Sequence, residues 1–107
     1  MKILKKEIGN VSGVKIYSIT FTNNNNYSII FYNFGGYIHQ VLIPYSNDQS
    51  KTEDVLLGYN DLRGCKISSG YFNAIIGRVG NRICNAKFFL NDVEFNLYKN
   101  IPPHHLH

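Results

Sequence analysis

The chain reads KIYSITF at residues 15–21, where aromatic and aliphatic residues at positions 17, 19 and 21 alternate with isoleucine, serine and threonine. A period of two over seven residues predicts a half-buried β-strand. The asparagine-rich residues 22–26 that follow predict a turn, because asparagine tolerates left-handed backbone conformations and hydrogen-bonds its own main chain. Residues 27–32 read as a second strand, so the two stretches predict a β-hairpin.

Outward from this hairpin, short strand patterns recur with turn residues between them. We predict further strands at residues 37–43, 54–58, 71–76, 87–90 and 93–97. Pro44 ends the first of these, and Asn91-Asp92 is a two-residue hairpin signal between the last two. Residues 60–64 predict a single helical turn, and residues 68–70 a loop. Because no window keeps a helical period over three turns, the sequence predicts an all-β sandwich or barrel.

Composition places the chain among small globular proteins. It has 107 residues, of which 44% are hydrophobic, and no apolar run long enough to span a membrane. A β-fold needs its sheet edges paired or covered, and this chain ends without a polar cap, so we expect residues 1–107 to be a single partial domain, the front of a larger β-domain. The N-terminus lacks the apolar segment of a signal peptide, and the two cysteines lack CxxC spacing. A cytoplasmic location and reduced thiols are therefore expected.

The net charge of +4 comes from scattered lysines and arginines, and no basic stripe is interleaved with aromatic residues. Nucleic acid and membranes are therefore not expected as partners, and the sequence leaves the oligomeric state open. Neither GxSxG nor GxGxxG occurs, and the acidic pairs Glu53/Asp54 and Asp92/Glu94 read as solvated surface charges. Three histidines crowd the C-terminus, but no cysteine or carboxylate lies near them in sequence, so no metal site is expected.

The stretch GRVGNRI at residues 77–83 follows an apolar run and carries two arginines four positions apart. An unpaired buried charge is costly, so at least one of these arginines should have a defined partner. Asn81, Arg82 and a terminal histidine together offer several directional donors and acceptors, which suits a polyhydroxylated ligand. A structural ion pair between an arginine and a carboxylate explains the residues equally well.

The same stretch resembles the GRVANRI signature of the aldose 1-epimerases, or galactose mutarotases. Four further segments resemble that family in the same order: NFGG through IP at residues 33–44, DVLLGY at 54–59, the hairpin at 88–97 and HLH at 105–107. The resemblance covers most of the chain from about residue 33. It departs from the family at Gly80, where alanine is usual, and in the approach to the last motif, residues 101–104.

The resemblance implies the N-terminal part of a galactose mutarotase-like β-supersandwich, an isomerase fold. It also implies a free hexose, such as galactose or glucose, as the small-molecule partner. The family's substrate-binding residues fall on Asn81, Arg82 and His107, and the family's activity requires neither a cofactor nor a metal. A histidine acid and a glutamate base perform the family's ring opening, and both are expected beyond His107. No catalytic residue is therefore expected in this chain, which alone should be inactive.

Two other functions remain open from the sequence. One is a non-catalytic carbohydrate-binding or structural β-module that retains part of the pocket. The other is a relative that acts on phosphorylated or different sugars, which would need cationic contacts beyond the GRVGNRI stretch.

Overall fold

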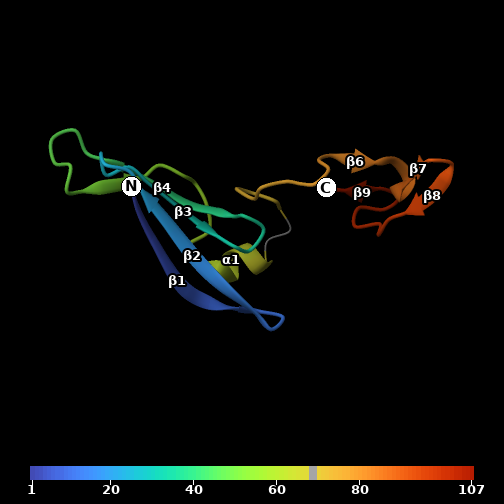
Figure 1. The fold of residues 1–107 in the computed structure, drawn as a ribbon, viewed down its shortest axis with the longest axis horizontal. Coiled ribbons are helices and arrows are strands. Elements are labelled where there is room, and N and C mark those ends of the chain that lie inside the picture. Colours follow the sequence, from blue (N-terminus) through green and yellow to red (C-terminus); the bar gives the residue numbers. More distant parts are fainter. Residues whose placement is uncertain (68–69) are drawn as a thin grey trace. The chain divides into compact units, whose positions relative to one another are not determined.

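A computed structural model describes residues 1–67 and 70–107. The chain divides into two compact units, residues 1–75 and residues 76–107, which are described separately below (Figure 1). The loop expected at residues 68–70 falls largely outside the described residues.

The first unit contains a five-stranded antiparallel sheet in the order β1-β2-β3-β4-β5. Its strands are β1 (Lys2–Val11), β2 (Val14–Thr22), β3 (Ser28–Tyr32), β4 (Ile38–Pro44) and β5 (Thr52–Asp54) (Figure 1). The predicted β2–β3 hairpin and the strand that ends at the proline are confirmed. Strand β1 was missed in the sequence, because three lysines interrupt its apolar pattern.

The turn between β2 and β3 forms through asparagine chemistry, as predicted. The Asn23 side-chain oxygen accepts hydrogen bonds from the backbone N–H groups of Asn25 and Tyr27, at 2.9 and 3.0 Å. Asn26 has a φ of 60°, in the left-handed region that asparagine tolerates. The polar run therefore sets the register in which Phe21 lies opposite Ile29.

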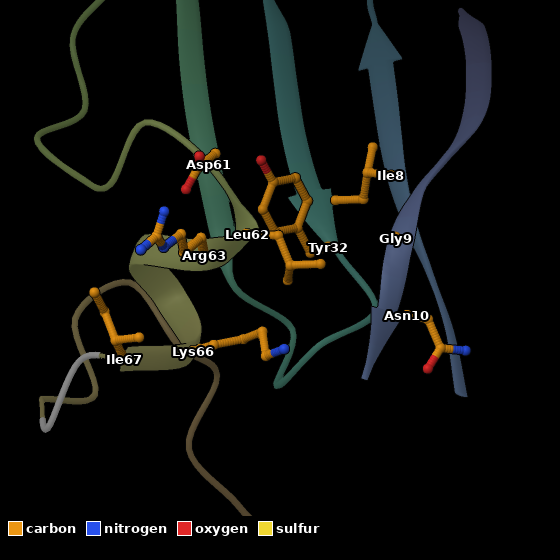
Figure 2. A pocket seen from close by; sticks show the side chains of 9 residues that line it. All are labelled: Ile8, Gly9, Asn10, Tyr32, Asp61, Leu62, Arg63, Lys66 and Ile67. Carbon is orange, nitrogen blue, oxygen red and sulfur yellow. The ribbon is translucent and has the colours of Figure 1, made fainter. Parts of the chain in front are cut away.

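The core of this unit lies on the face of the sheet that packs against α1 (Leu62–Ile67). Ile16, Tyr32 and Tyr37 are buried there, and Leu62 and Tyr59 pack against them. The single helical turn predicted at residues 60–64 is thus confirmed, with its start two residues later than expected (Figure 2). It exists because Leu62 covers an aromatic floor, since six residues alone are too few to form a stable helix.

The strand predicted at residues 54–58 is wrong. The sheet ends at Asp54, whose carboxylate accepts the N–H groups of Val41 and Leu56 at 3.0 and 3.1 Å. These bonds turn the chain away from β4, and Leu57 is left 95% exposed. The apolar residues 55–57 predicted a buried strand, but the hydrogen bonds of the Asp54 carboxylate end the pairing with β4 before them.

The strand predicted at residues 71–76 is also wrong. Asn73 has a φ of 58°, which breaks an extended backbone. The segment is held by isolated bonds instead: the Asn73 carbonyl accepts Ile38 N–H at 2.8 Å, and Ile75 N–H donates to the Gly35 carbonyl at 3.1 Å. It therefore lies beside the start of β4 without forming a ladder.

The second unit contains two small sheets, β6 with β9 and β7 with β8. Its elements are β6 (Arg82–Ile83), the 3-10 turn η1 (Cys84–Ala86), β7 (Lys87–Leu90), β8 (Val93–Asn96) and β9 (His105–Leu106) (Figure 1). The predicted Asn91-Asp92 turn is confirmed: both residues have positive φ, as a tight hairpin requires. Phe88 and Phe95 lie opposite each other, with ring centroids 5.3 Å apart. Only Ala86 and Leu106 are buried in this unit.

The all-β prediction is confirmed, since α1 is the only α-helix in the part of the chain that the structure describes. Both cysteines are free, as expected. Within residues 1–67 and 70–107, no helix has the length and apolar composition that a membrane crossing needs.

The glycine pair before β4 gives a prediction for stability. Both glycines have left-handed backbones, with φ of 61° at Gly35 and 59° at Gly36. A Cβ at Gly35 would meet nothing within 4 Å, whereas one at Gly36 would lie 2.9 Å from Ile75 Cδ1. Gly35→Ala should therefore lower the free energy of unfolding by about 1–2 kcal/mol. Gly36→Ala should lower it by a further ~1 kcal/mol or more, because of the overlap.

Urea denaturation followed by circular dichroism measures both variants against the parent chain. Equal losses for the two alanines would contradict the packing of residue 75 against the turn.

Candidate functional site

The candidate site is built on the pairing of β6 with β9. These strands are antiparallel, with Arg82 opposite Leu106 and Ile83 opposite His105. The pairing thus brings residues 82 and 83 beside residues 105 and 106, which lie at least 22 positions later in the chain. A two-residue ladder has little stability of its own, so the contacts at its ends determine whether it persists.

At one end of the ladder, Asn81 and His107 bond reciprocally. The His107 N–H donates to the Asn81 carbonyl at 3.0 Å, and the Asn81 N–H donates to His107 Nδ1 at 3.1 Å. Asn81 has a φ of 67°, a conformation that asparagine accepts more readily than most residues. Because Nδ1 is an acceptor here, the neutral imidazole carries its proton on Nε2. The structure therefore brings together all three residues predicted to bind substrate, Asn81, Arg82 and His107.

The other end of the ladder has an equivalent bond. The N–H of Asn85, whose φ is 52°, donates to His104 Nδ1 at 3.1 Å. The ring of His105 approaches two backbone oxygens, with Nδ1 2.6 Å from the Tyr98 carbonyl and Nε2 3.2 Å from a terminal oxygen of His107. The crowded histidines of the C-terminus are thus engaged by the main chain. Among the described residues, no group of three or more histidines, cysteines or carboxylates could hold a metal.

Asn100 holds the outer edge of β9. Its side-chain oxygen accepts the Leu106 N–H at 2.7 Å, and its side-chain nitrogen donates to the Leu106 carbonyl at 2.8 Å. The amide thus occupies the place of a neighbouring strand and satisfies both backbone groups of a buried residue. Sequence reasoning missed Asn100. An isolated asparagine before two prolines gives no signal for this role.

The two arginines of the GRVGNRI stretch have no ion-pair partner among the described residues, where ion pairs join Lys15 to Glu7, Lys51 to Asp48 and Lys87 to Glu94. Arg82 is exposed beside the Asn81–His107 pair. The Oδ1 atom of Asn81 accepts the Arg82 N–H at 2.8 Å, which leaves the amide nitrogen as a donor. The structural ion pair considered from the sequence is therefore not found within residues 1–67 and 70–107.

One carboxylate of each acidic pair, Glu94 and Asp54, is held by hydrogen bonds from neighbouring residues. Glu94 accepts bonds from the Asn96 amide and from Lys87, and these bonds hold the pKa of its carboxyl below the ordinary value. Burial tends to raise the pKa of Asp54, but hydrogen bonds from Leu56, Val41 and Gln40 outweigh it and lower the pKa. Both carboxylates stay ionised near neutrality. Neither has the raised pKa of a general acid.

His39 is half-buried in the first unit and stacks on Tyr32, with ring centroids 4.7 Å apart. Its Nδ1 atom is buried without a hydrogen-bond partner among the described residues. Burial lowers the pKa of the imidazole, against the opposing attraction of Asp54. His39 is therefore packed into the core side of this unit.

Three comparisons with known proteins bear on this arrangement. Residues 17–107 match the model of the aldose 1-epimerase family. Galactose mutarotase of Mus musculus is 41% identical over 59 residues, which are 55% of this chain and 17% of the mouse protein. A probable aldose 1-epimerase of Arthroderma benhamiae is 30% identical over 80 residues, or 71% of this chain and 18% of the fungal one. The chain thus spans less than a fifth of the length of these relatives.

A solved structure agrees on the fold. Galactose 1-epimerase from Lactobacillus acidophilus NCFM superposes with a TM-score of 0.77 and 16% identity, over 99% of this chain and 30% of the bacterial one. The match supports the predicted β-sandwich architecture.

The Asn100 bonds give a prediction for the ladder. Asn100→Ala removes both partners of the buried Leu106 backbone, and each unsatisfied group costs about 1–3 kcal/mol. We expect faster amide hydrogen exchange at Leu106, whose N–H loses its acceptor, and at His107, whose pairing with Asn81 is weakened. Asn96→Ala is the matched control, because that amide bonds only the exposed Glu94. Unchanged exchange at Leu106 would rule out the role given to Asn100.

His39 gives a prediction for pH dependence. The unfolded chain takes up a proton near the ordinary histidine pKa of about 6.5, whereas the folded ring, with its lowered pKa, does so only at lower pH. The free energy of unfolding should therefore fall as the pH drops through this value, and level off below the folded pKa. His39→Phe keeps the stacking on Tyr32 and removes the titration.

Urea denaturation between pH 7.5 and pH 5 should show a shallower loss of stability in the phenylalanine variant than in the parent chain. Parallel pH profiles would exclude a buried, neutral His39.

Proposed function

The chain belongs to the aldose 1-epimerase family, and on this premise we propose that it carries one wall of a hexose-binding site. Asn81, Arg82 and His107 would form that wall. In the intact protein the site would interconvert the α and β anomers of a hexose such as galactose or glucose. We propose further that residues 1–107 form a single partial domain of the family's β-sandwich.

The reciprocal bonding of Asn81 and His107 is the observation that carries this proposal. It holds the His107 ring against the Asn81 backbone, beside Arg82, which has no carboxylate partner among the described residues. The wall then presents a planar fork of guanidinium donors, an amide donor and an imidazole whose Nε2 is protonated. Vicinal hydroxyls on a pyranose ring need such closely spaced directional partners. Because bonds to the main chain hold the His107 ring and the Asn81 amide before a ligand arrives, binding needs to order mainly the exposed Arg82 side chain.

Anomer interconversion requires more than this wall. A base must take the proton from the C1 hydroxyl while an acid protonates the ring oxygen, so that the ring opens, the C1–C2 bond rotates and the ring recloses. Within residues 76–107 the carboxylates are Asp92, in the hairpin turn, and Glu94, bonded to Lys87 and Asn96. Among the described residues, neither forms an ion pair with Arg82, and Glu94 is engaged by Lys87 and Asn96. We propose that the 107-residue chain binds and orients a sugar without accelerating the reaction.

A non-catalytic carbohydrate-binding module is the second candidate function, because binding a sugar through Asn81, Arg82 and His107 needs no carboxylate. The two functions differ in whether the intact protein also carries a catalytic acid and base. A whole enzyme has the acid and base in addition to this wall, and a binding module does not.

Arg82→Ala tests the proposed wall. We expect weak galactose binding by the parent chain, and at least about a tenfold loss in the variant, since charge-assisted hydrogen bonds contribute about 1.5–3 kcal/mol. Titration with galactose, followed at the backbone amides of residues 81, 82 and 107 by NMR, measures the affinity. Arg78→Ala is the control, because it removes the same charge four positions away.

Equal losses from the two arginine variants would contradict the assignment of Arg82. In the same samples, polarimetry of fresh α-glucose should show the buffer rate. A faster rate with the parent chain would refute the statement that this chain lacks the chemistry.

A further inference from the structure

The end of the β6–β9 ladder opposite the wall, at Asn85 and His104, repeats the chemistry of the wall itself. At the wall, the Asn81 N–H donates to His107 Nδ1 at 3.1 Å, and Asn81 has a φ of 67°. At the far end, the Asn85 N–H donates to His104 Nδ1 at 3.1 Å, and Asn85 has a φ of 52°. In both places a left-handed asparagine gives its N–H to an imidazole of the C-terminal segment. The function proposed above uses His107 and leaves His104 without a role.

The backbone at the far end needs support. Asn85 and the next residue, Ala86, both have left-handed backbones, with φ of 52° and 53°. Alanine adopts this conformation at a cost, because its Cβ approaches the following carbonyl oxygen. Ala86 is only 1% exposed, and its carbonyl accepts the Leu97 N–H at 2.8 Å. Asn85 is exposed, so the bond to His104, and not burial, holds this residue in place.

His104 is itself held by the main chain. It pairs with Ile101 in an isolated bridge, in which the His104 N–H donates to the Ile101 carbonyl at 2.8 Å and the Ile101 N–H donates back at 3.3 Å. Two prolines, Pro102 and Pro103, lie between them, and each proline ring fixes its own φ. The turn therefore holds His104 at the start of β9, where its ring reaches Asn85.

The ladder connects the far end to the wall over a short length. Ile83 lies opposite His105 and Arg82 opposite Leu106, so two residue pairs separate the two histidine bonds. A ladder this short has little stability of its own, and each closing bond therefore affects the other. Loss of the His104 bond would release the left-handed turn and then the Ile83–His105 pair, which is next to Arg82.

We propose that His104 is a positioning residue of the wall. Its Nδ1 atom accepts the Asn85 N–H and so keeps β6 and β9 in the register that holds the Asn81 N–H against His107. His104 acts through the ladder and does not touch the sugar. This inference rests on the proposed function, since the geometry that His104 maintains is the one offered to the hexose.

Two substitutions separate the acceptor atom from the bulk of the ring. His104→Phe keeps a planar ring and removes the acceptor, whereas His104→Asn keeps an acceptor, because asparagine Oδ1 is as many bonds from Cα as histidine Nδ1 is. Tyr98→Phe is the matched control in the same unit. Tyr98 is 80% exposed, and its contact with His105 uses the backbone carbonyl. Contacts between the stacked rings of Phe88 and Phe95 verify that the unit folds in each variant.

The first measurement is made without ligand. The ¹⁵N spectrum of the His107 ring reports whether Nδ1 accepts a hydrogen bond, and amide exchange at Asn81 and His107 reports whether the ladder is closed. We expect His104→Phe to move the Nδ1 signal towards that of free imidazole and to speed exchange at both amides about fivefold, the effect of one ordinary hydrogen bond. His104→Asn should recover most of this change, and Tyr98→Phe should cause none.

The second measurement is titration with galactose, followed at the backbone amides of residues 81, 82 and 107 by NMR. We expect the parent chain and Tyr98→Phe to bind alike, and His104→Phe to bind about fivefold more weakly. His104→Asn should recover most of the affinity. A His104→Phe chain that binds as tightly as the parent, or a loss that His104→Asn does not recover, would overturn the role of His104.

Failure of the wall and failure of the His104 role give different results. A parent chain that does not bind galactose refutes the wall, and the role of His104 in sugar binding falls with it. Binding that Arg82→Ala weakens and His104→Phe leaves unchanged retains the wall and refutes the positioning role alone. Loss of the Phe88–Phe95 contacts in His104→Phe would show that His104 holds the whole unit, which also contradicts a role confined to the ladder.

Discussion

The second unit depends on the hydrogen bonds that close the β6–β9 ladder at Asn81 and His107. Apolar burial cannot hold these two short strands, because Ala86 and Leu106 are the only buried residues of the unit. Polar side chains supply the missing order. Imidazole nitrogens accept the N–H groups of Asn81 and Asn85, and the Asn100 amide takes both backbone groups of Leu106. Each bond satisfies a main-chain group that a longer sheet would have paired.

The same bonds connect fold to function. The left-handed backbone of Asn81 directs its N–H towards the His107 ring, and this bond selects the tautomer with the proton on Nε2. Arg82, the next residue, is then exposed without an ion-pair partner among the described residues. A strand end that holds an amide and an imidazole beside an exposed guanidinium suits a ligand rich in hydroxyl groups. In the proposal above, the wall orients the sugar and other groups move its protons.

The sequence predicted those parts of the fold that are determined by neighbouring residues, such as alternating strands and tight turns. Alternation predicted β2, the asparagine-rich turn predicted its hairpin with β3, and Asn91-Asp92 predicted the β7–β8 turn. The sequence-based predictions failed where a single polar residue interrupted an apolar run. The Asp54 carboxylate ended the sheet, and the left-handed backbone of Asn73 prevented a strand. Strand β1 was hidden by its lysines, and pairing between residues 82 and 106 has no local signature at all.

The candidate site was predicted through family resemblance. The residues themselves indicated only that an arginine near position 80 needed a partner, and left a ligand and a carboxylate equally possible. The structure brings Asn81 and His107 together, which no spacing rule could supply across 26 positions. Asn100 could not have been predicted, because its role depends on the edge of a strand that the sequence did not reveal.

The protonation of the His107 ring tests the central claim most directly, since the claim is that the ladder prepares this side chain for a sugar. Long-range ¹H–¹⁵N correlation spectra of the imidazole distinguish the two neutral tautomers. The account predicts a proton on Nε2 and an Nδ1 that accepts the Asn81 N–H, with the Nε2 signal shifting on addition of galactose. A proton on Nδ1, or an Nε2 signal that galactose leaves unchanged, would contradict it.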